Sequence, residues 1–317
     1  MNRLTVSPSP HIFAHNSTQS IMLDVIIALL PAAVASVIFF GAASIAVIAV
    51  CVISSFAAEF IFNLIVKKEQ QTAWDLSAVV TGLLLALNLP ANIPLWQAAV
   101  GSVFAIVVVK GLFGGIGQNF ANPAITGRIF MLIAFSSMTV SAFPEGSTDA
   151  VSGATTLSVL KNYAGAESLE NIPSLLDLFL GKCGGALGET SALALLIGGI
   201  YLVIRGVISW HTPVTFIATV FVLTLISSGG DVHYAAAQIL SGGLFIGAIF
   251  MATDYATTPN TKWGKVVFGL GCGLITVLIR LFGSYPEGVS FSILLMNILT
   301  PYIERWTRTR PLGGIKA

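Results

Sequence analysis

The stretch that decides the fold is IMLDVIIALLPAAVASVIFFGAASIAVIAVCVISSFAAEFIFNLIV, which covers residues 21–66. Only two of its side chains, those of Asp24 and Glu59, carry a charge. A helix that crosses a bilayer needs about 20 mostly apolar residues, and this stretch is long enough for two. We therefore predict two spanning helices, over residues 21–41 and 43–66.

The composition of the whole chain points to the same class of protein. Hydrophobic residues make up 55% of the 317 residues, charged residues make up 9%, and the mean hydropathy is +0.89. Since a soluble domain carries about 25% charged residues, this chain must face lipid over most of its surface. Its net charge of +1 argues against nucleic-acid binding, which requires concentrated Lys and Arg.

The same length criterion, applied along the chain, predicts ten spanning segments. We expect an all-α integral membrane protein in which residues 1–317 form a single membrane domain. The ten segments are 21–41, 43–66, 75–90, 94–112, 124–143, 186–206, 212–229, 234–252, 264–282 and 287–303.

The orientation of these segments follows from the positive-inside rule. With the N-terminus inside, only Lys161, Lys182 and Arg280 fall outside. This split predicts a bacterial cytoplasmic (inner) membrane protein with cytoplasmic ends, including the tail 306–317, and an extracytoplasmic connection 144–185. Twelve basic residues then lie on the cytoplasmic side: Arg3, Lys67, Lys68, Lys110, Arg128, Arg205, Lys262, Lys265, Arg305, Arg308, Arg310 and Lys316.

Two interrupted segments suggest an internal repeat. Residues 81–96 (TGLLLALNLPANIPLW) and 242–263 (GGLFIGAIFMATDYATTPNTKW) each run from a short apolar helix through polar and proline residues to a Trp that starts the next helix. Interrupted helices in corresponding halves are typical of five-plus-five repeats with an internal site. We expect half-repeats over about 21–143 and 186–305; chance matches of Gly and Trp are the alternative.

The long connection begins with a hydroxyl-rich stretch, TDAVSGATTLS at residues 148–158. Asp149, Ser152, Gly153, Ala154 and Thr155 fit the pattern D-x-x-[ST]-G-A-T. This pattern resembles the acceptor motif at which a flavin transferase joins FMN to a threonine through a phosphoester. The alternative is an ordinary polar loop in which Ser and Thr bond their own backbone. In the same connection, SLLDLFLGK (174–182) predicts a short interfacial helix.

Together with GGIGQNFANPA after the fourth span, this motif makes the whole chain resemble the D subunit of the Rnf complex, an ion-pumping ferredoxin:NAD oxidoreductase. The B subunit of the sodium-translocating NADH:quinone reductase is a more distant relative. The resemblance implies covalent FMN on Thr155 rather than Thr156, which stands where proline is more often expected. It also implies a flavin relay coupled to Na⁺ or H⁺ movement, with partners that include a second FMN subunit, iron–sulfur subunits and a flavin transferase. The three cysteines are too scattered for a metal motif.

The stretch GLFGGIGQNFANPA, residues 111–124, is the second candidate for flavin binding. Gly115 and Gly117 would let a flat ligand approach the backbone, and the amides of Asn119 and Asn122 offer both donors and acceptors. The resemblance implies a second, non-covalent flavin, riboflavin, which we place near these residues. For Asn122, capping of the fifth helix before Pro123 is an equally good interpretation.

Charged residues inside spans are functional candidates by default. Glu59 and Asp24 are accordingly candidates for an ion pathway; packing, or a bond to Asn63, is the alternative for Glu59, and an interfacial position is the alternative for Asp24. Asp75 is expected to cap the third helix. The rival function for the whole chain is a urea-channel-like transporter or ion channel without a redox role, since broken helices fit that class too.

Overall fold

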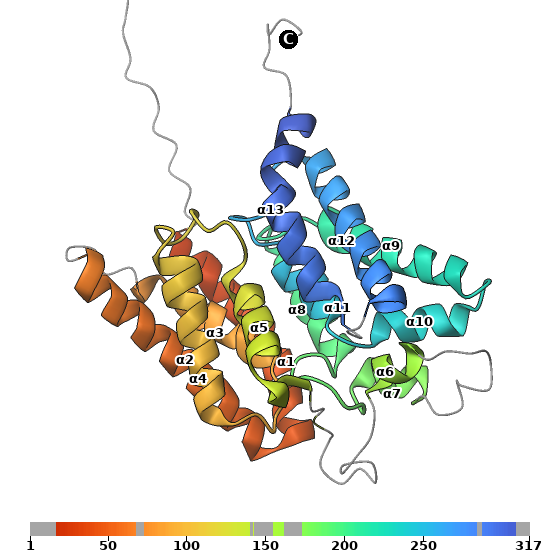
Figure 1. The fold of residues 1–317 in the computed structure, drawn as a ribbon, viewed down its shortest axis with the longest axis horizontal. Coiled ribbons are helices and arrows are strands. Elements are labelled where there is room, and N and C mark those ends of the chain that lie inside the picture. Colours follow the sequence, from red (N-terminus) through yellow and green to blue (C-terminus); the bar gives the residue numbers. More distant parts are fainter. Residues whose placement is uncertain are drawn as a thin grey trace, which may run out of the picture.

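A computed structural model describes residues 17–67, 73–139, 142, 155–161, 173–283 and 287–308. Within these ranges the chain is helical and contains no β-strand, apart from an isolated bridge between Ala142 and Gly185. In Figure 1 the helices of the N-terminal half, coloured red to yellow, lie to one side of those of the C-terminal half, coloured green to blue. The all-α prediction is confirmed for the described residues.

The first half consists of five helical segments, several of which change their helical type. Gly41 separates the first two helices, and Pro94 precedes the fourth. The bounds are α1 Thr18–Phe40, α2 Ala42–Phe62 with π-helix η1 Asn63–Lys67, 3₁₀-helix η2 Ala73–Asp75, α3 Ser77–Leu87, α4 Leu95–Phe104 with π-helix η3 Ala105–Gly111, and α5 Pro123–Ala134 followed by η4 Ser136–Thr139.

The second half follows two short helices, which lie at the end of the bundle opposite the last turn of α13 (Figure 1). One of them, α7, lies within residues 174–182, where the sequence predicts a short helix. The bounds are α6 Thr156–Lys161, α7 Leu175–Leu180, α8 Ala192–Ile204, α9 His211–Ser227, α10 Val232–Leu240, α11 Leu244–Ile246 with π-helix η6 Gly247–Met251, α12 Lys262–Phe282 and α13 Val289–Thr307.

Each of the ten predicted segments contains a helix, but the lengths differ. By length and hydropathy, α1, α2 with the first residues of η1, and α12 can cross a membrane, and α10 with α11–η6, bent by 65°, can form a fourth span. Five other apolar helices are shorter, and the fifth ends at Ala134 rather than near residue 143. The chain is a multi-pass membrane protein, and the count of ten spans stays a prediction.

Helices at corresponding positions of the two halves pack against each other in the same way. In the first half α2 packs on α4, and in the second half α9 packs on α12; across the halves, α1 packs on α8 and α5 on α13. Small residues permit close approach: a Cβ on Gly198 of α8 would lie 2.0 Å from the carbonyl oxygen of Ala28 in α1. A Cβ on Gly269 of α12 would lie 2.0 Å from Oγ1 of Thr215 in α9. A five-plus-five repeat would produce such matched pairs, and the repeat itself stays a prediction.

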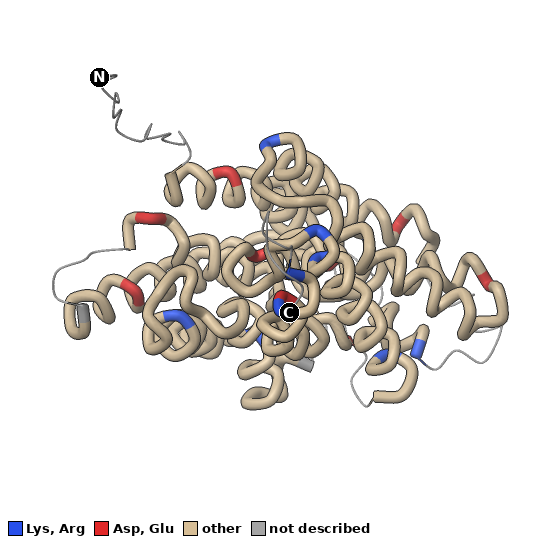
Figure 2. The backbone as a smooth tube through the Cα atoms, turned by 90° about the horizontal axis from the view of Figure 1, so that it is seen from above, with Lys and Arg blue, Asp and Glu red and all other residues tan. Residues whose placement is uncertain are grey.

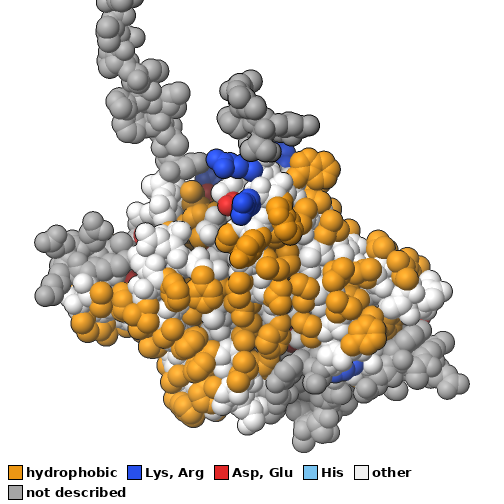
Figure 3. All heavy atoms as spheres, turned by 45° about the horizontal axis from the view of Figure 1, so that its top comes forward, with side chains coloured by type: hydrophobic (Ala, Val, Ile, Leu, Met, Phe, Trp, Pro, Cys, Tyr) orange, Lys and Arg blue, Asp and Glu red, His pale blue; other side chains and the backbone are white. Residues whose placement is uncertain are grey.

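The surface of the bundle is apolar. Charged residues are sparse along the tube in Figure 2, and hydrophobic side chains are spread over much of the face in Figure 3. Exposed side chains include Ile38 at 73% and Phe282 at 81%. Several charges instead lie inside: Lys110, Arg128 and Arg280 are all buried. Arg280 donates to the backbone oxygens of Gln238 and Ser241, so it does not extend to the interface as an exposed residue would.

Candidate functional site

Thr155 is the one residue of the D-x-x-[ST]-G-A-T motif that the structure describes. The other motif residues, Asp149, Ser152, Gly153 and Ala154, lie outside the described residues. Thr155 precedes the first turn of α6, and its Oγ1 accepts the Ser158 N–H at 3.3 Å. Its side chain is half-buried, whereas the neighbouring Thr156 is buried. Of the two adjacent hydroxyl residues, Thr155 is therefore the more accessible.

A small cavity lies beside Thr155. Glu189, Ser241, Gly242 and Glu287 line it together with Thr155. The hydroxyl of Ser241 is buried and has no hydrogen-bond partner among the described residues. Thr155 of the motif therefore lies beside polar side chains from the interior of the bundle.

The glycine-rich loop after η3 requires glycine for its shape. Gly114, Gly115 and Gly117 have φ values of +116°, +107° and +84°, a region that other residues rarely adopt. A Cβ on Gly117 would meet nothing within 4 Å, so its neighbourhood is open. The loop ends at Asn119, whose Oδ1 is buried and has no hydrogen-bond partner within the described ranges.

Asn122 caps α5, as one of the two sequence interpretations predicts. Its Oδ1 accepts the N–H groups of Ala124 and Ile125 at 3.0 and 3.4 Å, and Pro123 occupies the first turn. Its Nδ2 donates to the backbone oxygen of Met251 at 3.4 Å, at the end of η6. Most of the bonding capacity of Asn122 is thus used within the fold, unlike that of Asn119.

A second cavity, larger than the one beside Thr155, contains both asparagines. It encloses about 800 Å³, including its open mouth, and Gly117 lines it while Gly115 does not. Lys110 is the only cation and Asp254 the only anion among the described lining residues. The other walls come mainly from α1, α3, α8 and the break after η6: Ile21, Met22, Val25, Ser77, Val80, Thr81, Leu84, Ile116, Pro123, Leu202, Val207, Ile208, Phe250, Thr253, Tyr255 and Ala256.

Asp254 lies in the irregular segment after η6. Burial raises the pKa of its carboxyl, and bonds from the Ala256 N–H and the Thr257 hydroxyl, both at 3.2 Å, lower it. Asp75, expected to cap α3, accepts the Ser77 N–H at 2.9 Å, although Leu76 is the residue that immediately precedes the helix.

Both ion-pathway candidates are paired with cations. Glu59 lies within 2.7 Å of Nζ of Lys110 through each carboxylate oxygen, and both side chains are buried. Asp24 accepts from the Tyr201 hydroxyl at 2.8 Å and from Arg205 at 3.1 Å. Asp24 therefore connects α1 to the C-terminal end of α8, and its position relative to the membrane surface stays a prediction.

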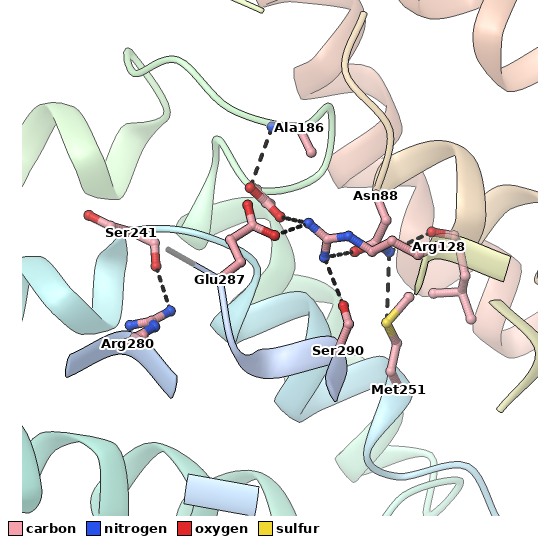
Figure 4. Close-up of polar contacts among 10 residues, drawn as sticks. Asn88, Arg128, Ala186, Ser241, Met251, Arg280, Glu287 and Ser290 are labelled. Carbon is pink, nitrogen blue, oxygen red and sulfur yellow. Dashed lines mark hydrogen bonds and ion pairs between the residues drawn. The ribbon is translucent and has the colours of Figure 1, made fainter. Parts of the chain in front are cut away.

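A third buried cluster surrounds Arg128 of α5 (Figure 4). Its guanidinium donates to Oδ1 of Asn88 at 2.8 Å, to Oε1 of Glu189 at 2.6 Å, to Glu287, and to the Ser290 hydroxyl at 3.3 Å. The sequence predicted only that Arg128 is one of twelve basic residues on the cytoplasmic side, and it did not predict the residues that Arg128 contacts. The signal that could have found it is the one used for Glu59, a charge inside an apolar segment.

A chain of contacts that includes Met251 links the two cavities. Asn122, which lines the larger cavity, bonds the backbone of Met251, and Asn88 contacts the Met251 sulfur at 3.7 Å. Asn88 in turn accepts from Arg128, whose partner Glu189 lines the cavity beside Thr155. No group of three or more residues suited to holding a metal occurs in the described part of the chain.

The fold and its interior define a multi-pass membrane protein with interrupted helices and two cavities, each lined in part by charged side chains. Comparison with known proteins gives the family. The family model described as "NQR2, RnfD, RnfE family" matches residues 5–313. The chain belongs to this family.

Similar proteins are the D subunits of ion-translocating complexes. The D subunit of a Na⁺-translocating ferredoxin:NAD⁺ oxidoreductase complex from Acetobacterium woodii is 50% identical, over 99% of this chain and 96% of that relative. Its proton-translocating counterpart from Clostridium ljungdahlii is 40% identical, over 98% and 97%. The D subunit of an ion-translocating oxidoreductase complex from Stutzerimonas stutzeri is 38% identical, over 94% and 93%.

Proposed function

We propose that this chain is the flavin-carrying membrane subunit of a multi-subunit, redox-driven Na⁺ or H⁺ pump that relays electrons between ferredoxin and NAD. The observation that carries the assignment is similarity over nearly the full length to relatives named as subunits of such complexes. Its partners are then the other membrane and peripheral subunits. The relatives are named for different ions, so family membership does not select the coupling ion.

The proposed covalent site is Thr155, bearing FMN through a phosphoester. Two features support this choice over Thr156: Thr155 completes the D-x-x-[ST]-G-A-T pattern, and its side chain is half-buried while that of Thr156 is buried. A transferase must reach the hydroxyl that it modifies. Placing residues 144–185 on the extracytoplasmic side agrees with the positive-inside count.

The proposed second flavin, riboflavin, occupies the cavity lined by Gly117, Asn119 and Asn122. The unpartnered Oδ1 of Asn119 fits such a ligand, because an isoalloxazine edge carries an N–H donor that this acceptor can bind. Gly117 leaves room for a flat ring. A flavin supplies one- and two-electron exchange; the chain's own residues hold it, exclude water and set the surrounding charge.

The decisive experiment is detection of covalent flavin. The natively matured chain should fluoresce under ultraviolet light after denaturing electrophoresis and show the added mass of one FMN phosphoester. Thr155→Val should abolish both signals, whereas the adjacent Thr156→Val should retain them. A wild-type chain without flavin would remove the redox assignment and favour the channel-like alternative; fluorescence that survives in Thr155→Val would place the attachment elsewhere.

A further inference from the structure

Lys110 joins the larger cavity to a buried carboxylate. It is 3% exposed, it lies near the end of η3, and it lines the cavity that contains Asn119. Its Nζ lies 2.7 Å from both oxygens of Glu59 and also donates to the Ser77 hydroxyl. The ammonium group therefore has Glu59 as a direct partner while belonging to the wall of the ligand cavity.

A buried ammonium is costly, and helix packing alone does not require one. Replacing a buried ion pair by apolar residues of similar volume is often neutral or stabilising. The chain nevertheless keeps this cation in a wall that is otherwise mostly apolar. The only anion among the described wall residues, Asp254, already accepts bonds from Ala256 and Thr257.

The backbone around this cavity is also unusual. Two of the three π-helical segments in the described residues contribute to its wall: η3 carries Lys110, and η6 contains Phe250 and ends just before Thr253 and Asp254. Short π-helices are rare and frequently occur at functional sites. The positions of these two therefore indicate the same cavity.

We propose that Lys110 electrostatically tunes the non-covalent flavin from the cavity wall, with Glu59 holding its ammonium group in position. This inference rests on the proposed function, since it concerns the ligand of that cavity. The carbonyl-bearing edge of an isoalloxazine gains negative charge on reduction, and a protein controls flavin electronics by the charge that it places near this ring. Lys110 stabilises the reduced ligand more than the oxidised one, while Glu59 opposes that preference.

The two residues therefore have effects of opposite sign. Removing the charge of Lys110 weakens binding of the reduced flavin relative to the oxidised form and lowers the midpoint potential. Removing the charge of Glu59 strengthens the field of Lys110 and raises the potential. A purely structural pair would give shifts of one sign, or none, because both substitutions break the same contact.

The test uses the full-length chain in a Thr155→Val background, so that only non-covalent flavin contributes to the signal. Riboflavin is measured after denaturing extraction, and its midpoint potential by spectroelectrochemical titration. Lys110→Met should change the ratio of affinities for reduced and oxidised flavin by about tenfold or more at an effective dielectric constant near 20. A tenfold change corresponds to about 30 mV downward for a two-electron couple.

Three further variants make the result decisive. Lys110→Arg keeps the charge and should stay near the wild-type potential; Glu59→Gln should shift it upward; and Lys262→Met, at an exposed lysine at the start of α12, should leave it unchanged. Bound riboflavin with an unchanged potential in Lys110→Met, or equal downward shifts in Lys110→Met and Glu59→Gln, would overturn the inference alone. Absence of riboflavin from every chain, wild type included, would instead overturn the proposed second flavin.

Discussion

At the scale of single residues, the two asparagines of the glycine-rich loop separate into different roles. Oδ1 of Asn122 accepts hydrogen bonds from N–H groups at the N-terminus of α5. By contrast, Oδ1 of Asn119 is buried without a hydrogen-bond partner in the described chain. Leaving a buried acceptor unsatisfied costs about 1–3 kcal/mol. Asn119 is therefore the residue whose substitution reports on a ligand rather than on folding.

We expect Asn119→Leu to lower the riboflavin content of the purified chain, with affinity reduced roughly tenfold by loss of one buried hydrogen bond. Flavin extracted under denaturing conditions and quantified by fluorescence provides the measurement. Gln118→Leu is the matched control, because Gln118 is exposed in the same loop and does not line the cavity. Equal flavin content in both variants would show that Asn119 does not contact the ligand.

At the scale of elements, close packing between α1 and α8 depends on the absence of a Cβ at Gly198. A Cβ on Gly198 would lie 2.0 Å from the backbone oxygen of Ala28, so α8 must shift to admit any larger residue. We expect Gly198→Val to destabilise the chain by about 1–3 kcal/mol, the usual cost of overpacking. Thermal unfolding in detergent measures it.

Ile200, two residues away on the same helix and 58% exposed, provides the control. Ile200→Ala should leave stability within about 0.5 kcal/mol, as exposed substitutions usually do. Similar melting temperatures for Gly198→Val and wild type would mean that α1 and α8 are packed less closely than the structure indicates.

The elements themselves could be read from the sequence, because hydropathy and caps are local signals. Pro94 and the Asn122–Pro123 pair correctly mark the starts of α4 and α5. The ion pairs could not be read in this way. Lys110 and Glu59 are 51 residues apart, and Arg128 is 61 residues from Glu189, so no periodicity links them. A buried charge can be suspected from sequence, but its partner is fixed only by tertiary packing.

At the scale of the whole molecule, the interrupted helices meet in the interior. The end of α3 is completed from another segment: the N–H of Gly188 donates to the Leu87 oxygen at 2.6 Å and that of Leu187 to the Leu89 oxygen at 3.0 Å. Irregular backbone survives at membrane depth only when its polar groups are satisfied in this way. The same region carries the chain of contacts from Asn122 through Met251 and Asn88 to Arg128, so the break after α3 lies between the two proposed flavin sites.

The orientation of the bundle predicts which sites are reached from each side of the membrane. Leu176 in α7 is 73% exposed and Trp306 near the end of α13 is 80% exposed, and α7 lies at the opposite end of the bundle from the last turn of α13 (Figure 1). In intact cells, a membrane-impermeant maleimide should label Leu176→Cys but label Trp306→Cys only after permeabilisation. The unmodified chain is the control, since Cys51, Cys183 and Cys272 are all buried. The reverse pattern would place Thr155 in the cytoplasm and contradict the inside assignment of twelve basic residues.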